Sequence, residues 1–99
     1  MKVRFTPRAR RRAKLVLAWW RANRPVAPTL FEDELTQAIE TLCEQPHAGT
    51  VYDPVAAARV RRLLLPKSEQ HVYYVVDEAA EVVVIHTIWG ARRGRGPKF

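Results

Sequence analysis

The sequence contains little that would build a disulfide or metal scaffold. It has one cysteine in 99 residues, Cys43. A disulfide framework is therefore excluded, and a zinc site lacks the second thiol or nearby Cys/His partner that it would need. The three histidines are too scattered to suggest another metal site. The sequence predicts a domain that uses no metal and no other cofactor.

Long apolar runs are also missing. No run approaches the roughly 18 residues that a membrane span requires, and residues 14–20, after the basic N-terminus, are too short and bulky for a secretory signal. The composition, 47% hydrophobic and 27% charged, is that of a globular chain, and a chain of this length can bury one modest core. We expect a single domain over residues 1–99, located in the cytoplasm and without membrane contact.

Acidic residues are absent from the first quarter of the chain. Residues 1–25 contain nine Lys/Arg and no acid, residues 26–50 contain five acids and no Lys or Arg, and residues 51–99 are basic again, with eight Lys/Arg against five acids. The net charge of +7 is therefore unevenly distributed. A polarised surface of this kind fits nucleic acid or an acidic protein segment as a partner, and composition alone does not choose between them.

The first half of the chain predicts one strand and two helices. Residues 1–6 alternate apolar and polar side chains, as a half-buried strand does. Thr6 and Pro7 then favour a helix start, and Asn23 to Pro25 end this helix. A second helix follows from Thr29 to the Gln45-Pro46 pair. The expected core faces of the two helices are Ala9, Ala13, Val16, Leu17 and Trp20 in the first, and Phe31, Leu35, Ala38, Ile39 and Leu42 in the second.

The second half predicts strands. Residues 71–76 and 81–89 are rich in β-branched and aromatic side chains. Residues 59–65 are strand-like but alternate imperfectly, and residues 51–57 are ambiguous because Pro54 argues against a long element. The expected order is β-α-α-β-β-β. We predict an α+β fold with an antiparallel sheet, a two-helix hairpin packed on one face and the first strand at an edge. Residues 91–99 are expected to form a loosely held basic tail.

Several segments together resemble the RelE/ParE superfamily of toxins from bacterial type II toxin–antitoxin systems. They are the opening Val3-Arg4-Phe5-Thr6-Pro7, the Ala38–Leu42 core followed by Pro46 and Gly49, the Val60–Leu63 strand, the Tyr73–Asp77 strand and the closing Val84–Arg92 segment. Their order and spacing match the family over nearly the whole chain. The resemblance implies a toxin that arrests growth and is neutralised by a small antitoxin protein.

Members of this superfamily act in two ways, and the resemblance leaves both open. RelE-like members cleave mRNA in the ribosomal A site with cationic and aromatic side chains of the sheet, whereas ParE-like members poison DNA gyrase. In the RelE-like case, His71 and Arg92 match positions of catalytic arginines, and Arg61 and Lys67 would supply phosphate contacts. RelE-like enzymes carry a tyrosine a few residues after the second arginine, but here residues 94–99 read Gly-Arg-Gly-Pro-Lys-Phe. This departure favours the ParE-like branch.

The residues expected to contact the target are mostly cationic. They are Arg61, Lys67, Tyr73, Trp89, Arg92, Arg93, Arg95 and Lys98. By helical spacing, Trp20 lies on the core stripe of the first helix, and Trp19 lies beside it, where it could meet a partner. His86, in an apolar strand, is expected to be a partly buried, hydrogen-bonded histidine.

The expected partner is a cognate antitoxin whose acidic and apolar C-terminal segment complements the arginine-rich surface. We therefore expect a toxin–antitoxin hetero-oligomer, with gyrase or the ribosome and its mRNA as target. A basic binding module without toxicity remains a third alternative.

Overall fold

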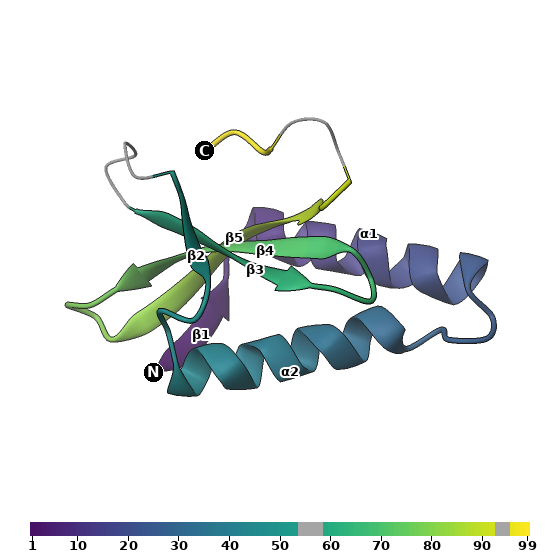
Figure 1. The fold of residues 1–99 in the computed structure, drawn as a ribbon, viewed down its shortest axis with the longest axis horizontal. Coiled ribbons are helices and arrows are strands. Elements are labelled where there is room, and N and C mark those ends of the chain that lie inside the picture. The colour runs from purple at the N-terminus through teal and green to yellow at the C-terminus, as the bar shows by residue number, and fades with distance from the viewer. Residues whose placement is uncertain (54–58, 93–95) are drawn as a thin grey trace.

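The computed structural model describes residues 1–53, 59–92 and 96–99. Within them the chain forms β1 (Lys2–Phe5), α1 (Pro7–Asn23), α2 (Leu30–Glu44), β2 (Thr50–Asp53), β3 (Val60–Leu65), β4 (Gln70–Asp77) and β5 (Val82–Gly90). Figure 1 shows these elements, with α2 running below the sheet and α1 passing behind it.

The strands form one sheet in the order β1-β5-β4-β3-β2. β1 pairs with β5 in parallel, while the other neighbouring strands pair antiparallel. The predicted α+β class, the helical hairpin and the edge position of the first strand are therefore confirmed, but the sheet is mixed and has a fifth strand. β1 and β5 are neighbours in the sheet, although both helices and the strands β2, β3 and β4 separate them in sequence. A connection of this length allows the two strands to run parallel.

The extra strand, β2, lies in the segment that the sequence left ambiguous. It is short, and its pairing with β3 shifts register between Val51 and Asp53. The remainder of the ambiguous segment, residues 54–57, lies outside the described residues. A four-residue strand at the sheet edge carries too few alternating positions to be recognised from its own sequence.

The two helices begin differently. Thr6 caps α1 as expected, since its hydroxyl accepts the Ala9 N–H at 3.1 Å, and Pro7 takes the first helical position. Thr29 makes no such cap on α2, and its hydroxyl instead donates to the Asp33 carboxylate at 3.2 Å. An ion pair between Arg21 and Glu32 at 3.0 Å joins the two helices near their connection.

One hydrophobic core lies between the helices and the sheet. The predicted helix stripes are confirmed: their members are buried in it or packed against it. The buried members are Ala9, Val16, Trp20, Phe31, Ala38, Leu42, Leu65, Val72, Tyr74, Val83, Ile85 and Ile88. The helices cover one face of the sheet, so the other face is free of them.

A bulge changes the alternation of β5. Tyr73 is opposite Thr87 and Tyr74 is opposite Ile85, so His86 is the additional residue. Tyr74 and Ile85 belong to the core, whereas Tyr73 lies on the face that the helices leave uncovered. We call this second face the open face.

Residues 96–99 lie against the open face, and we call them the C-terminal strap. Pro97 is buried, the Phe99 ring lies 5.6 Å from that of Tyr73, and Arg8 donates to the Lys98 carbonyl at 2.8 Å. In Figure 1 the C-terminus lies on the opposite side of the sheet from α2. The expectation of a loosely held tail does not describe these four residues, because two of them are apolar and cover aromatic rings of the sheet.

Candidate functional site

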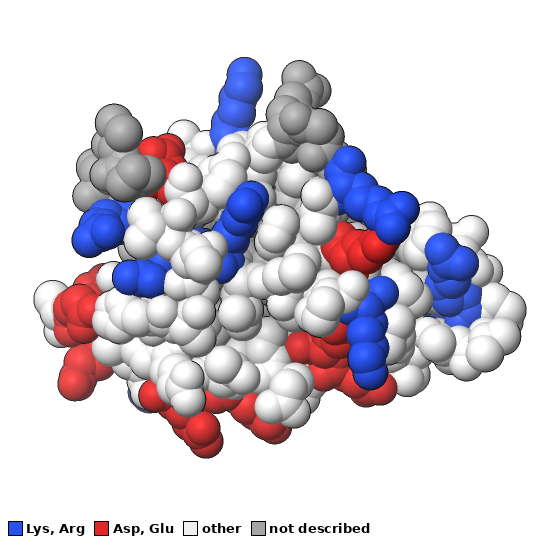
Figure 2. All heavy atoms as spheres, viewed as in Figure 1, with Lys and Arg blue, Asp and Glu red and all other residues white. Residues whose placement is uncertain are grey.

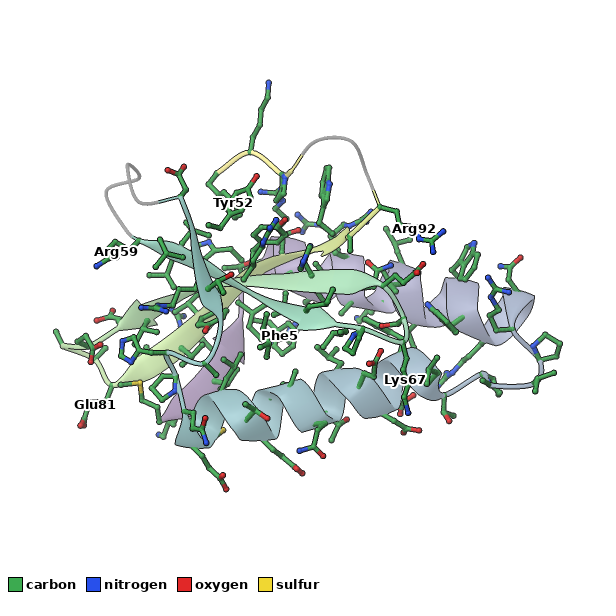
Figure 3. All side chains as sticks on the ribbon, in the orientation of Figure 1. Phe5, Tyr52, Arg59, Lys67, Glu81 and Arg92 are labelled. Carbon is green, nitrogen blue, oxygen red and sulfur yellow. The ribbon has the colours of Figure 1, made fainter. Side chains whose placement is uncertain are left out.

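The open face contains a cluster of rings and one guanidinium, which we call the open-face cluster: Tyr52, Arg62, His71, Tyr73 and Phe99. The Tyr52 and Tyr73 rings are 4.8 Å apart, and His71 lies 5.9 Å from Tyr73, both edge to face. The Arg62 guanidinium lies over the Tyr52 ring at 5.1 Å. Figure 3 shows Tyr52 on the side of the sheet where the strap lies.

Strand pairing explains why these residues meet. Arg62 is directly opposite Tyr73, and side chains opposite each other on neighbouring strands point to the same face. His71 precedes Tyr73 by two residues and therefore shares this face. The Tyr73 side chain is only 1% exposed, because Tyr52 and Phe99 cover it.

Two histidines of the open face favour the neutral form. Burial, and then the charge of Arg62, lower the pKa of His71 below its usual 6.5. Burial, and then the charges of Arg8 and Arg4, lower the pKa of His86 in the same way. Uncharged imidazoles beside fixed guanidinium groups can accept a proton near an anion, so the cluster has the ingredients for acid–base chemistry.

Arg92 does not join this cluster. Its guanidinium forms an ion pair with Glu69 at 2.7 Å, and its side chain is 82% exposed. No contact links it to His71 among the described residues. The structure therefore does not bring together the two residues that the RelE-like interpretation paired.

A second feature is a groove between α1 and the turn that joins β3 to β4, and we call it the α1 groove. Its volume is about 710 Å³. Figure 3 shows two of its residues, Lys67 and Arg92, near the same end of the molecule. The groove is lined by Arg12, Leu15, Val16, Trp19, Trp20, Arg24, Lys67, Ser68, Glu69, Gln70, Gly90 and Arg92.

Aromatic side chains form one wall of the α1 groove. The Trp19 and Trp20 rings meet edge to face at 5.7 Å. Arg24 lies over both rings, at 5.5 Å from Trp19 and 5.8 Å from Trp20. Trp20 is buried, as its place on the helical stripe predicted, while Trp19 is 48% exposed.

Arg61 holds the loop before β2 and does not face the open-face cluster. It is opposite Tyr74, so its side chain leaves β3 on the other face from Arg62. Its guanidinium donates to the carbonyl oxygens of His47 at 3.2 Å and of Gly49 at 2.8 Å. The structure therefore places Arg61 against the loop before β2, away from the open-face cluster.

The other expected target-binding residues are dispersed. Trp89 is half-buried, and the Arg12 guanidinium lies over its ring at 5.7 Å. Lys98 is exposed on the strap. Arg93 and Arg95 lie outside the described residues.

Sequence reasoning missed three members of the open-face cluster, Arg62, Tyr52 and Phe99, the last because residues 91–99 were expected to form a loosely held tail. The sequence does indicate that Arg61 and Arg62 point to opposite faces of the sheet, because successive side chains of a strand alternate between its faces. Which of them joins Tyr73 depends on the register between β3 and β4, which the sequence does not reveal. Tyr52 was missed because β2 itself was not recognised.

The described part of the chain contains no group of three or more His, Cys, Asp or Glu residues that could hold a metal ion. Among the described helices, none has the length and apolar character needed to cross a bilayer.

Comparisons with known proteins connect this geometry to a family. No curated protein sequence matches the chain. The fold is similar to a solved structure of the chromosomal ParDE toxin–antitoxin system from P. aeruginosa, with a TM-score of 0.69, 14% identity and coverage of 93% of this chain and 97% of that one. It is also similar to the intact E. coli RelBE toxin–antitoxin complex, with a TM-score of 0.59, 18% identity and coverage of 93% and 98%.

Both structural similarities are below 25% identity and therefore show the fold alone. The sequence comparison shows the family, because residues 3–94 match the model of a family described as ParE toxin of type II toxin-antitoxin system, parDE. This match runs from the second residue of β1 to beyond the end of β5, and it includes both helices and all residues of the α1 groove. The chain therefore belongs to the ParE toxin family of type II toxin–antitoxin systems.

Proposed function

We propose that this protein arrests growth by poisoning DNA gyrase and that a cognate antitoxin neutralises it. The family match over residues 3–94 supports a toxin of the ParE type. The similarity to toxins solved within ParDE and RelBE systems supports an antitoxin partner in a hetero-oligomer.

One observation favours gyrase over mRNA as the target. Arg92 is ion-paired with Glu69 at the end of β5, while His71 lies within the open-face cluster beside Tyr73. Cleavage of RNA without a metal needs a base, an acid and a cation arranged around one phosphate. The separation of His71 from Arg92 supports a toxin that acts by binding.

The charge distribution suggests which surface meets the target. Figure 2 shows acidic side chains gathered along the lower edge, where α2 lies, and basic side chains above them. We propose that the basic side contacts the gyrase–DNA complex through Lys67, Arg92 and Lys98, with Arg93 and Arg95 as further cations of the same chain end. Trp89 and Tyr73 would support this surface from within the sheet.

The test is to assay one toxin preparation for two activities. We expect it to inhibit gyrase supercoiling, or to trap cleaved DNA, and to leave ribosome-bound mRNA intact. Arg92→Ala should weaken the effect on gyrase, while Arg10→Ala, which removes a cation from the exposed side of α1, serves as the matched control. Intact gyrase activity at saturating toxin would exclude this function.

A RelE-like ribonuclease is the second candidate, because the lowered pKa of His71 leaves an imidazole able to accept a proton beside Arg62. In this case the same preparation would cleave mRNA on the ribosome. The cleavage would be lost in His71→Gln and Arg62→Ala variants. Growth that continues normally when the toxin is induced without its antitoxin would instead indicate a non-toxic binding module.

A further inference from the structure

The two helices of the hairpin carry opposite charge. α1 contains six Lys or Arg residues and no acid, whereas α2 contains five acids and no Lys or Arg. Across residues 7–44, all of which the structure describes, one ion pair joins the two helices, between Arg21 and Glu32 at 3.0 Å. Most of the other charged side chains of the hairpin are exposed. Each helix therefore presents charge of a single sign to solvent, and the two signs are opposite.

An apolar groove runs between α1 and α2, and we call it the hairpin groove. Its volume is about 530 Å³. Lys14 and Arg21 border it on α1 and Glu32 borders it on α2, while none of its residues lines the α1 groove. An apolar strip with a charged border is typical of a surface that a protein partner covers. The half-buried apolar side chains that line the hairpin groove are Phe5, Ala13, Leu17, Leu35 and Ile39.

The register of the hairpin places an unpaired cation and an unpaired acid at the same height. The helices run in opposite directions (Figure 1), and the contact between Arg21 and Glu32 fixes their alignment. Lys14 is seven residues before Arg21, and Glu40 is eight residues after Glu32. At a rise of about 1.5 Å per residue, both lie about 10–12 Å from that contact along the hairpin. Neither Lys14 nor Glu40 has an ion-pair partner among the residues that the structure describes.

We propose that the hairpin binds a second copy of this chain, in a two-fold dimer in which α1 of each protomer packs against α2 of the other. A two-fold axis parallel to the hairpin groove moves α1 over α2 without changing its height along the groove. Lys14 of one protomer therefore meets the partner's Glu40, and the symmetry repeats this contact. The four helices form a bundle in which every neighbouring pair is antiparallel, and the apolar linings of the two grooves meet at its centre.

A second copy suits this surface because the hairpin is complementary to itself. The two-fold operation places a cationic helix against an acidic helix twice, so both contacts bring opposite charges together. A nucleic acid or an acidic peptide would instead meet the acids of α2. The dimer leaves the α1 groove and the open-face cluster uncovered, because neither contributes to the hairpin groove. The proposal therefore does not depend on the target of the toxin or on its antitoxin.

The experiment measures the molar mass of the full chain by sedimentation equilibrium over a range of concentrations. The wild type should associate to a dimer, and the dimer should weaken at high salt because its ion pairs are exposed at the border of the interface. Lys14→Glu should weaken the dimer about tenfold or more, because it opposes two acids in each of two equivalent contacts. Glu40→Lys should have the same effect for the mirrored reason. The double variant Lys14→Glu/Glu40→Lys should dimerise as the wild type does.

Arg59→Glu is the matched control. It reverses one exposed positive charge, as Lys14→Glu does, but Arg59 precedes β3 and lies away from both helices (Figure 3). It should dimerise as the wild type does. Lys14 and Glu40 are exposed in the single chain, so reversing their charge leaves its fold intact, and circular dichroism checks this for each variant.

Each result decides the proposal. Loss of the dimer in both single variants and its return in the double variant would support the pairing of α1 with the partner's α2. A wild type that stays monomeric at every concentration would overturn the proposal, and so would a dimer that neither Lys14→Glu nor Glu40→Lys weakens. A double variant that stays monomeric would rule out the predicted register. A mass that grows beyond the dimer would rule out the two-fold arrangement, because an isologous contact closes at two copies.

Discussion

Two adjacent tyrosines of β4, Tyr73 and Tyr74, have different surroundings because they point to opposite faces of the sheet. Tyr74 faces the helices, and its hydroxyl accepts the Gly49 N–H at 2.8 Å inside the core. Tyr73 faces the other way, beneath Tyr52 and Phe99. The chemistry of the two side chains is identical, but only Tyr74 satisfies a buried backbone donor.

Tyr74→Phe should therefore lower the free energy of unfolding by about 1–3 kcal/mol, because the buried Gly49 N–H loses its partner. The hydrogen bond is tested at Tyr74 and not at Gly49, because a Cβ on Gly49 would lie 2.5 Å from the Arg62 carbonyl oxygen. Urea unfolding measures the change. Tyr73→Phe is the control, and an equal loss in both variants would show that the hydrogen bond is not the cause.

At the scale of elements, one carboxylate connects α2 to the turn between β3 and β4. Glu34 accepts the backbone N–H groups of Lys67 at 3.0 Å and of Ser68 at 2.7 Å. This turn also forms one side of the α1 groove. The second helix thus holds one wall of the α1 groove in place.

Glu34→Ala should destabilise the fold by about 1.5–3 kcal/mol, because it removes two hydrogen bonds to a charged acceptor. Glu40→Ala, which removes an exposed acid from the same helix, changes the net charge equally and should leave the stability of the fold unchanged. Equal effects of the two substitutions on thermal unfolding would point to charge alone.

The C-terminal strap passes very close to the Tyr52 ring at Gly96. A Cβ on Gly96 would collide with the Tyr52 hydroxyl, so any larger residue must displace the ring or the strap. Because a displaced strap would carry Phe99 away from the Tyr73 ring, Gly96→Ala should free the chain end.

We expect carboxypeptidase to release Phe99 several-fold faster from Gly96→Ala than from the wild type, because local opening exposes the terminus. Lys98→Ala keeps the main-chain carbonyl at residue 98 that accepts the hydrogen bond from the Arg8 guanidinium, and it should behave as the wild type does. Unchanged release from Gly96→Ala would mean that the contact with Tyr52 does not hold the strap.

At the scale of the whole molecule, the sequence predicted the helices and strands that a regular pattern of apolar residues specifies. The stripes from Ala9 to Trp20 and from Phe31 to Leu42 defined both helices, and the apolar runs defined the three strands of the meander. The family resemblance was carried by these same segments, which is why it held over the whole fold.

What the sequence did not predict depends on pairing between distant segments. Arg62, not Arg61, joins the open-face cluster because of the β3–β4 register. Arg92 meets Glu69, which is far from it in the chain. The strap packs because Phe99 finds Tyr73 and His86 on a bulged strand. None of these contacts has a local periodic signal.

The open face also makes the stability of the whole molecule depend on pH. The pKa values of His71 and His86 are both lowered in the folded state, first by burial and then by neighbouring arginines. The unfolded chain, with histidine pKa values near 6.5, therefore takes up protons at higher pH than the folded one. The folded state is favoured above this value, and its advantage declines as the pH falls through 6.5 toward the lowered folded values.

Urea unfolding should accordingly show a lower free energy of unfolding at pH 5.5 than at pH 7.5, a range in which unperturbed carboxylates stay ionised. In the double variant His71→Gln/His86→Gln, which keeps a polar side chain at each position, the difference between the two pH values should shrink. The same difference in the double variant and the wild type would place the pH dependence elsewhere. A smaller difference would show that these two histidines resist protonation in the folded state, because of their burial first and of the neighbouring charges of Arg62, Arg8 and Arg4 second.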